Sequence, residues 1–251
     1  MLKTTNTKVS ISIVVPIYNS EKSIIELENR ISKSLTGLDY EIIFVDDHSI
    51  DDSYSIIKQL NNGSIIAISL KTNYGQQNAI KCGLDFSSKD YVITMDDDLQ
   101  HRPEDILLLV NKCKEYDVVY GIYNNKQHNH LRNFGSKLVN YIFNTVLKKP
   151  VNIRISSFRC MNRKIVDEIK TEKTSFVYLS AMILKKTLNI ANVEVTHEKR
   201  KYGDSNYNFA KLMNTVIKLY IYYSGNKLAS LFRKKSEQYD IEEIWRNEWN
   251  Y

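Results

Sequence analysis

The sequence has little of what would suggest flexible linkers or covalent cross-links. It contains three prolines and eight glycines in 251 residues, too few for low-complexity linkers. The cysteines are also few and scattered, at Cys82, Cys113 and Cys160, and no pair has the spacing of a metal site. An odd, dispersed set of this kind indicates reduced thiols in a reducing compartment.

Long hydrophobic runs are absent as well. The first ten residues are polar and lack the apolar stretch of a signal peptide. A membrane-spanning helix needs roughly 20 apolar residues, and the strongest candidate, 212–223, is interrupted by Asn214, Thr215 and Lys218. We therefore expect a protein that is soluble or lies on a membrane surface without crossing it.

Positive charge is in excess. The net charge is +6 and the pI is about 9.0. This balance favours an anionic partner, which can be a nucleotide phosphate, a lipid phosphate, a membrane face or a nucleic acid.

The first half alternates between apolar β-branched runs and amphipathic segments. The runs predict strands over 11–16, 41–45, 65–70, 91–95 and 118–120, with helices between them. Ser20 is the expected N-cap of the first helix. This rhythm predicts an α/β fold with a mostly parallel central sheet flanked by helices.

The second half has a different pattern. It predicts short strands over 157–161 and 193–196 and a helix over 163–170. Amphipathic stretches cover 131–147 and 207–232, and the latter predicts one long helix with a basic end. In the acidic tail, 236–251, Ile241, Ile244, Trp245 and Trp249 recur at helical spacing.

The segment Asp96-Asp97-Asp98-Leu99-Gln100-His101 directly follows the predicted strand over 91–95. An Asp-x-Asp at this point directs two carboxylates out of the carboxyl edge of the sheet, where open α/β sheets bind ligands. Paired hard oxygen ligands favour Mg²⁺ or Mn²⁺, and such a cation neutralises a diphosphate. An isolated Asp-x-Asp is also compatible with a solvated acidic turn, so the rest of the chain must decide.

Six motifs occur in order along the chain. They are Val15-Pro16-Ile17-Tyr18-Asn19; Phe44-Val45-Asp46-Asp47-His48-Ser49 with Asp51 and Ser53; Asn73-Tyr74-Gly75-Gln76 with Ala79; Met95 to His101 with Pro103-Glu104; Ser157-Phe158-Arg159; and Arg200 with Gly203 and Ser205. In this series the chain resembles family 2 glycosyltransferases of the GT-A fold over about residues 10–232. It is most similar to the branch that glycosylates polyprenyl phosphates, which includes dolichyl-phosphate mannose synthases and bacterial undecaprenyl-phosphate glycosyltransferases.

The residues that follow the predicted strands give a hypothesis for the nucleotide side. Asp96 and Asp98 are expected to bind the cation, and the resemblance adds Gln100 as a third ligand or phosphate contact. Asp97 is expected to face the protein or the ribose. The remaining contacts with the nucleotide are expected from the backbone of Pro16 and Tyr18 and from the side chains of Asp47 and Gln76.

The acceptor side follows from charge. A lipid phosphate is already ionised, so its attack needs positioning and cations rather than a general base. Candidates are Arg132, Arg159 and Arg200, since the guanidinium fork suits phosphate oxygens. Ser205 resembles part of the family's mobile loop that closes over the diphosphate. We assign the catalytic roles to Asp98, Arg132, Arg200 and Ser205.

The resemblance implies an inverting, metal-dependent enzyme. It would move a sugar from a UDP- or GDP-linked donor to undecaprenyl phosphate in cell-surface glycan synthesis, at the cytoplasmic face of the membrane. Residues 1–232 would form the GT-A domain, with a nucleotide-sugar half (about 10–121), an acceptor half (about 122–206) and an amphipathic helix (about 207–232). Residues 233–251 would form a tail whose Trp245 and Trp249 could dock a second copy or a membrane-embedded partner.

Two alternatives remain open. Relatives often carry an arginine where this chain has Tyr123, and a proline where it has Arg102. These differences weaken the hypothesis that the acceptor is a lipid phosphate. The acceptor could instead be a sugar hydroxyl of a lipid-linked oligosaccharide or another glycan, although Asp204 is then the sole loop candidate for a general base. A non-enzymatic nucleotide- or nucleic-acid-binding module is disfavoured, because a surface that only binds nucleic acid gains nothing from clustered carboxylates, and we expect no nucleic-acid partner.

Overall fold

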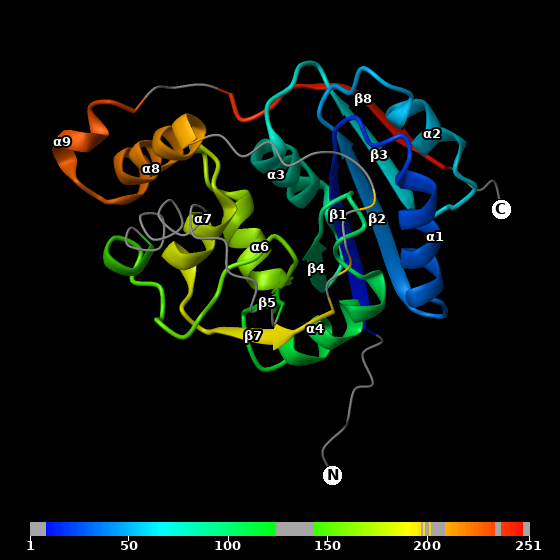
Figure 1. Ribbon diagram of the computed structural model, residues 1–251, viewed down its shortest axis with the longest axis horizontal. Helices are drawn as coiled ribbons and strands as arrows, with labels where there is room; N and C mark the ends of the chain where they lie inside the picture. Colours follow the sequence, from blue (N-terminus) through cyan, green and yellow to red (C-terminus); the bar gives the residue numbers. More distant parts are fainter. Residues whose placement is uncertain are drawn as a thin grey trace, which may run out of the picture.

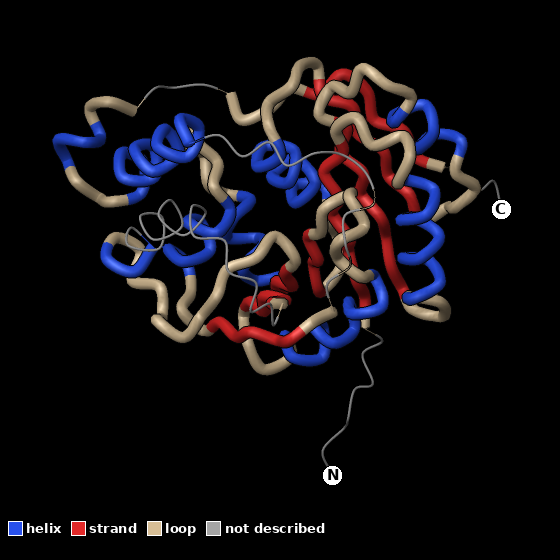
Figure 2. The backbone as a smooth tube through the Cα atoms, viewed as in Figure 1, coloured by secondary structure: helices blue, strands red, loops and turns tan. Residues whose placement is uncertain are grey.

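The computed structural model describes residues 9–123, 143–196, 198, 201, 209–233 and 237–247. Their strands form one sheet flanked by helices on both faces (Figures 1 and 2). The sheet has the strand order β7-β5-β6-β4-β1-β2-β3-β8. The expected α/β architecture with a mostly parallel sheet is confirmed, since among the described strands only β6 and β8 run against the others.

The first half supplies the parallel core of the sheet. Its strands are β1 (Ser10–Ile17), β2 (Asp39–Asp46), β3 (Ile65–Leu70), β4 (Tyr91–Thr94) and β5 (Val118–Ile122). They agree with the predicted strands to within a few residues. Their side chains are buried on both faces, as expected for parallel strands that are covered by helices.

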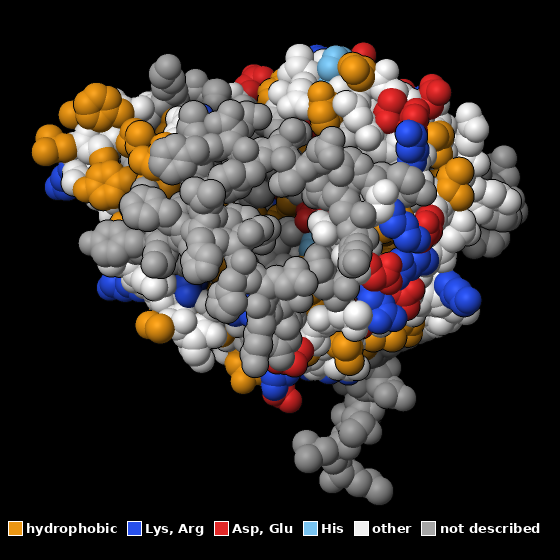
Figure 3. Space-filling view, in the orientation of Figure 1, with side chains coloured by type: hydrophobic (Ala, Val, Ile, Leu, Met, Phe, Trp, Pro, Cys, Tyr) orange, Lys and Arg blue, Asp and Glu red, His pale blue; other side chains and the backbone are white. Residues whose placement is uncertain are grey.

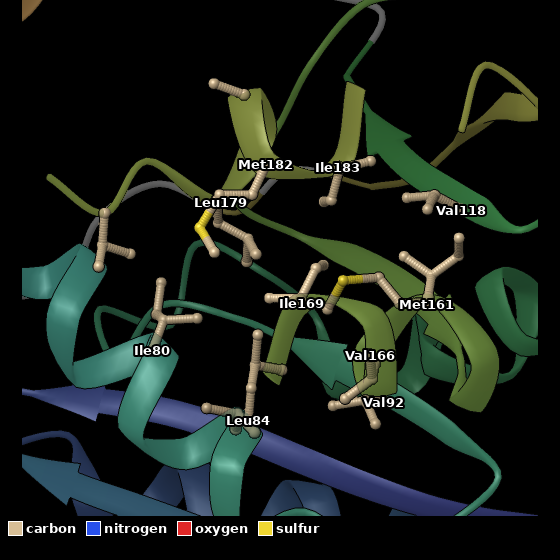
Figure 4. Close-up of a cluster of buried hydrophobic side chains, with 14 of the residues drawn as sticks. Ile80, Leu84, Val92, Val118, Met161, Val166, Ile169, Leu179, Met182 and Ile183 are labelled. Atoms are coloured by element: carbon tan, nitrogen blue, oxygen red, sulfur yellow. The ribbon is translucent and has the colours of Figure 1, made fainter. Parts of the chain in front are cut away.

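Two hydrophobic cores lie on opposite faces of the sheet. One face carries α1 (Ile24–Ser34), α2 (Ser53–Gln59) and α4 (Ile106–Cys113), which follows a short 3₁₀ helix (Pro103–Asp105). The other face carries α3 (Gln76–Phe86), α6 (Arg163–Lys170), α7 (Leu179–Lys186) and α8 (Phe209–Tyr223). Figure 4 shows part of the second core, where Ile80 and Leu84 of α3 lie near Val166 and Ile169 of α6.

The second half completes the sheet with antiparallel and parallel pairs. β6 (Arg159–Asn162) lies antiparallel between β4 and β5, and β7 (Ile190–Glu194) pairs in parallel with β5. The helix predicted over 163–170 is α6. The strand expected over 193–196 begins earlier, at Ile190, because the register of β7 is set by β5, with Val118 opposite Ile190.

The predicted N-cap at Ser20 is wrong. Helix α1 begins at Ile24 and is preceded by Ser23, whose backbone N–H donates to the Ser20 carbonyl at 3.0 Å. The Ser20 hydroxyl instead donates to Asp97. The Ser20 side chain, which the local pattern predicted to cap the helix, is therefore bonded to a residue distant in the sequence.

The single long helix expected over 207–232 is interrupted. Helix α8 ends at Tyr223, and a short α9 (Lys227–Ser230) follows. Gly225 has φ +73°, a left-handed conformation that ends a helix. Asn226 then caps α9 by accepting the N–H groups of Leu228 and Ala229. Among the described helices, none is long and apolar enough to pass through a bilayer.

The helical spacing of the tail is also misleading. Residues Ile241–Arg246 form β8, which pairs antiparallel with β3 at the edge of the sheet. Side-chain contacts hold the segment that leads into it: the Tyr239 hydroxyl donates to Asp85, and Lys71 pairs with Asp240 at 2.7 Å. The tail thus contributes a strand, Ile241–Arg246, to the central sheet.

Candidate functional site

The carboxyl ends of β1, β2 and β4 meet at one edge of the sheet. Ile17 lies opposite Asp46, and Val14 lies opposite Thr94. The residues that follow these strands, including Tyr18, Asp47 and Asp96, therefore share this edge, which is where open α/β sheets bind ligands.

The acidic loop, Asp96 to His101, is anchored by a buried leucine. The Leu99 side chain is fully buried in the core, and its backbone adopts φ +62°. A left-handed leucine is strained by about 1 to 3 kcal/mol, and such strain is concentrated at functional sites. The loop thus has one fixed course, with Asp96 and Asp98 on either side of Asp97.

Two side chains from other elements hold the Asp96 carboxylate. Gln76, the first residue of α3, donates from Nε2 to Asp96 Oδ1 at 2.6 Å. Ser157, just before β6, donates from Oγ to Asp96 Oδ2 at 2.7 Å. Gln76, which was predicted to contact the nucleotide, therefore lies at the acidic loop, and Ser157 was part of a motif without an assigned role.

Asp97 points toward the loop after β1. Its Oδ2 accepts the Ser20 hydroxyl and the backbone N–H of Tyr18, the latter at 3.3 Å. Burial raises the pKa of Asp97 to about 6, opposed by the hydrogen bond from Ser20 and aided by the neighbouring Asp96 and Asp98. Of the two orientations expected for Asp97, toward the protein or toward the ribose, these contacts correspond to the first.

Asp98 shapes the far side of the loop. Its Oδ1 accepts the backbone N–H of Gln100 at 3.1 Å. The carbonyl of Gln100 in turn accepts the backbone N–H of Glu198, at 3.2 Å, from the segment after β7. The chain that leads to the predicted Arg200 is therefore fixed to the acidic loop at Glu198.

His101 supports the loop from beneath. Its Nδ1 accepts the backbone N–H of Asp96 at 3.0 Å, so the proton of the neutral ring is on Nε2. The ring is 4% exposed and stacks on Phe158, with centroids 5.1 Å apart. A buried imidazole with these contacts supports the loop and is not placed to act as a base.

Asp47 is 2% exposed and orders the loop before α3. Its two carboxylate oxygens accept the backbone N–H groups of Tyr74 and Gly75 at 2.7 and 2.8 Å. Burial raises its pKa, and these two hydrogen bonds oppose the rise. Gly75 has φ +87°, so the loop needs a residue without a Cβ there. By ordering the two residues before it, Asp47 positions Gln76. Asp47 itself lies at the carboxyl edge of the sheet, where the nucleotide is predicted to bind.

The loop after β1 presents one exposed ring. Pro16 lies within β1, opposite Val45, and is buried, whereas the Tyr18 side chain is 49% exposed at the carboxyl edge. Asp46 has a structural role, since its Oδ2 accepts the backbone N–H of Ser49 at 3.2 Å. An exposed ring beside the acidic loop is a surface on which a nucleobase can stack.

The predicted cations divide into two groups. Arg132 and Arg200 lie outside the described residues, as does Ser205. Arg159 is described and is 3% exposed, donating from Nη1 to Ser180 Oγ at 3.0 Å and lying over the Tyr120 ring. Arg159 is buried and connects β6 to α7, so it is not an exposed cation available to a ligand.

An ion-pair cluster that the sequence did not reveal lies beside the acidic loop. Arg30 of α1 pairs with Glu104 at 2.7 Å and with Glu198 at 2.8 Å, and these partners raise its pKa. Lys201 pairs with Glu26 of the same helix. The described ends of the segment around Arg200 are therefore held against α1.

The site fits a cation that a ligand helps to coordinate. Among the residues that the structure describes, no three histidine, cysteine or acidic side chains are grouped closely enough to hold a metal alone. Mg²⁺ commonly uses one or two carboxylates together with substrate phosphates. A strained acidic loop at the carboxyl edge of an open sheet is the arrangement typical of a nucleotide-binding α/β protein.

Residues 12–170 match the model of Glycosyl transferase family 2, so the chain belongs to that family. Two similar proteins are undecaprenyl-phosphate 4-deoxy-4-formamido-L-arabinose transferases from Proteus mirabilis (strain HI4320) and Enterobacter sp. (strain 638). They are 37% and 36% identical over 218 residues, which is 83% of this chain. The chain spans 66% of the length of these relatives.

Solved structures confirm the GT-A fold. Glucosyl-3-phosphoglycerate synthase from Mycobacterium tuberculosis, in complex with Mn²⁺, UDP and phosphoglyceric acid, matches with a TM-score of 0.65 and 19% identity. The match covers 86% of this chain and 79% of the synthase. A second complex of that synthase, with Mn²⁺ and UDP-glucose, matches with a TM-score of 0.63 and 18% identity.

Proposed function

We propose that this chain is an inverting glycosyltransferase that moves a sugar from a nucleoside-diphosphate sugar to undecaprenyl phosphate in cell-surface glycan synthesis. The observation that carries the proposal is the acidic loop after β4, in which Gln76 and Ser157 hold Asp96 at the carboxyl edge of the sheet. Family membership and the names of the two bacterial relatives support the reaction and the lipid acceptor.

A divalent cation, Mg²⁺ or Mn²⁺, would be bound chiefly by Asp98. Both oxygens of Asp96 already accept a hydrogen bond within the protein, so Asp96 would contribute only the one lone pair left on each oxygen, together with its charge. Gln100 and the diphosphate oxygens would complete the coordination. The bound cation would supply charge neutralisation of the departing nucleoside diphosphate. Solved relatives hold Mn²⁺ or Mg²⁺ with UDP, which supports this assignment.

The nucleoside would lie along the loops that follow β1 and β2. The exposed Tyr18 ring would stack on the base, while the backbone after Pro16 would contact it edge-on. Asp47 would accept a base N–H with the lone pairs that Tyr74 and Gly75 leave over. A UDP-linked donor is the first choice because solved relatives bind UDP, and a GDP-linked donor is the second.

The acceptor phosphate would attack the anomeric carbon in line with the departing diphosphate. An ionised phosphate needs no general base, so Arg132, Arg200 and Ser205 would position it and screen its charge. The hydrogen bond from Glu198 to Gln100 supports this role for the following segment, because it fixes the chain two residues from Arg200 to the acidic loop. Because the acceptor is a membrane lipid, the protein would work at the inner face of the cell membrane.

Nucleoside diphosphate release tests the proposal. The purified chain is incubated with a panel of UDP- and GDP-sugars, Mn²⁺ or Mg²⁺, and undecaprenyl phosphate in detergent. Release that requires the lipid supports the proposal, whereas release that ignores the lipid favours a sugar hydroxyl as the acceptor. No release from any donor would refute the enzymatic assignment.

A further inference from the structure

Large apolar side chains are exposed together at the end of the α8–α9 hairpin. Leu228, Leu231 and Phe232 are 73%, 78% and 73% exposed, and we call these three the apolar tip. Ile217 and Tyr220 of α8 are also exposed. Figure 3 shows the hydrophobic atoms gathered at the end of the molecule where Figure 1 places α9. A contiguous exposed apolar surface of this kind marks an interaction site.

The hairpin that carries the tip is firmly attached to the domain. Val216, Leu219 and Tyr223 of α8 are buried in the core. The Tyr223 hydroxyl donates to the Phe176 carbonyl at 2.8 Å and accepts the N–H of Tyr178. Ala229 is the buried residue of α9. One face of the hairpin is therefore packed, and the exposed face is left for a partner.

The charge around the tip identifies the partner. From position 205 to 236 the sequence has six lysines and arginines and no aspartate or glutamate. Lys227 and Arg233, which flank the tip, are exposed. Apolar side chains bordered by exposed cations match the interface of an anionic lipid bilayer. A second copy of this chain would offer the same positive charge and would be repelled.

We propose that the apolar tip inserts into the headgroup region of an anionic membrane, with Lys227 and Arg233 bound to lipid phosphates. This docking surface deepens the proposed function, because it would bring the acceptor's bilayer to the protein. It does not involve the acidic loop, so the two assignments can fail separately. Insertion of leucine and phenylalanine side chains supplies the apolar free energy, and the cations add specificity for anionic lipid.

The test uses the full chain and vesicles without donor or acceptor. The double variant Leu231→Glu/Phe232→Glu is compared with Val151→Glu/Leu188→Glu, which places two charges at exposed apolar positions elsewhere. Flotation measures binding to phosphatidylcholine vesicles with and without phosphatidylglycerol. We expect wild type and control to bind the anionic vesicles, and the tip variant to bind at least about tenfold more weakly.

Other outcomes would overturn the proposal. They are equal binding by the tip variant and wild type, equal loss in both double variants, or no preference for phosphatidylglycerol. A second copy of the chain would cover the tip if the wild type were a dimer that does not bind vesicles and the tip variant were a monomer. Nucleoside diphosphate release in detergent, where docking is not needed, should be unchanged in the tip variant. If the wild type released no nucleoside diphosphate, the proposed function would be refuted, but the proposal that the tip binds membranes would be unaffected.

Discussion

Ser157 and Asp96 are 61 residues apart in the sequence and are joined by a hydrogen bond of 2.7 Å from Ser157 Oγ to Asp96 Oδ2. This bond connects the antiparallel strand β6 to the acidic loop after β4. Because Gln76 holds the other oxygen, the carboxylate plane of Asp96 is fixed before any ligand arrives. The site is therefore preorganised, which lowers the cost of binding a cation and a diphosphate.

Replacement of Ser157 by alanine should weaken cation-dependent nucleotide binding about tenfold, since loss of a partner that orients a metal ligand typically costs 10- to 100-fold. Calorimetric titration of UDP in the presence of Mn²⁺ measures this. Ser156→Ala is the matched control, because the Ser156 hydroxyl accepts the N–H of Phe158 and does not contact Asp96. Equal affinities for Ser157→Ala and wild type would show that Gln76 alone orients Asp96.

Substitution of the two outer aspartates should have unequal effects. Asp98→Asn should reduce cation-dependent UDP binding by about 100-fold or more, because it removes the principal ligand proposed for the cation. Asp96→Asn should cost less, since its oxygens are already shared with Gln76 and Ser157. The measurement is UDP affinity against Mn²⁺ concentration, with circular dichroism to confirm folding. A larger loss for Asp96→Asn would reverse the assignment.

Asp97 should make stability depend on pH. Its pKa rises from 3.8 to about 6 in the folded state, so folding favours the protonated form. The associated stability is complete below the unfolded pKa and is lost as pH rises through about 6. Above that pH, the partly buried carboxylate should cost about 1 to 3 kcal/mol. Asp97→Asn should therefore raise the free energy of unfolding at pH 7.5 by that amount.

Urea unfolding of both proteins from pH 4 to pH 8, without divalent cations, measures this difference. The advantage of Asp97→Asn should shrink as pH falls from 6 to 4, because the wild-type side chain becomes protonated. Asp52→Asn, at an exposed aspartate, serves as the control. A constant difference across the pH range would show that ionisation of Asp97 does not carry the effect.

Gly83 sets the distance between α3 and the sheet. A Cβ at this position would clash with Val14 Cγ1 and would lie 3.2 Å from Val45 Cγ2. Gly83→Ala should therefore destabilise the protein by about 1 to 3 kcal/mol, as overpacking of a core does. The urea midpoint measures the loss, and Lys33→Ala on the exposed side of α1 is the control. Stability equal to that of the control would mean that α3 moves outward without cost.

The first half of the fold could be predicted because local pattern and tertiary structure agree there. Runs such as Ile11 to Val15 are apolar without interruption, which suits strands buried on both faces. The carboxyl edge, and with it the positions of Asp96 and Gln76, follows from that alternation. The hydrogen bond between Gln76 and Asp96 was not predicted, because an edge shared by two residues does not specify which side chains meet there.

The errors arise where distant partners decide the structure. Ile241, Ile244 and Trp245 fit a helical spacing, but pairing with β3 makes the segment a strand. Ser20 is a good cap by composition, but Asp97 takes its hydroxyl. The cluster of Arg30 with Glu104 and Glu198 leaves no local signal, because its members come from three separate segments. Tertiary contacts of this kind cannot be read from periodicity.

The pairing of β3 with β8 has a consequence for synthesis of the chain on the ribosome. Contacts such as that of Asn247 with the Leu60 carbonyl join positions 187 residues apart. During synthesis, the backbone groups on the outer edge of β3 therefore stay unpaired until nearly all the other described elements have left the ribosome. An unpaired edge is open to association with other chains. Slow translation of the α8–α9 region would lengthen this interval, and the yield of folded protein should fall with it.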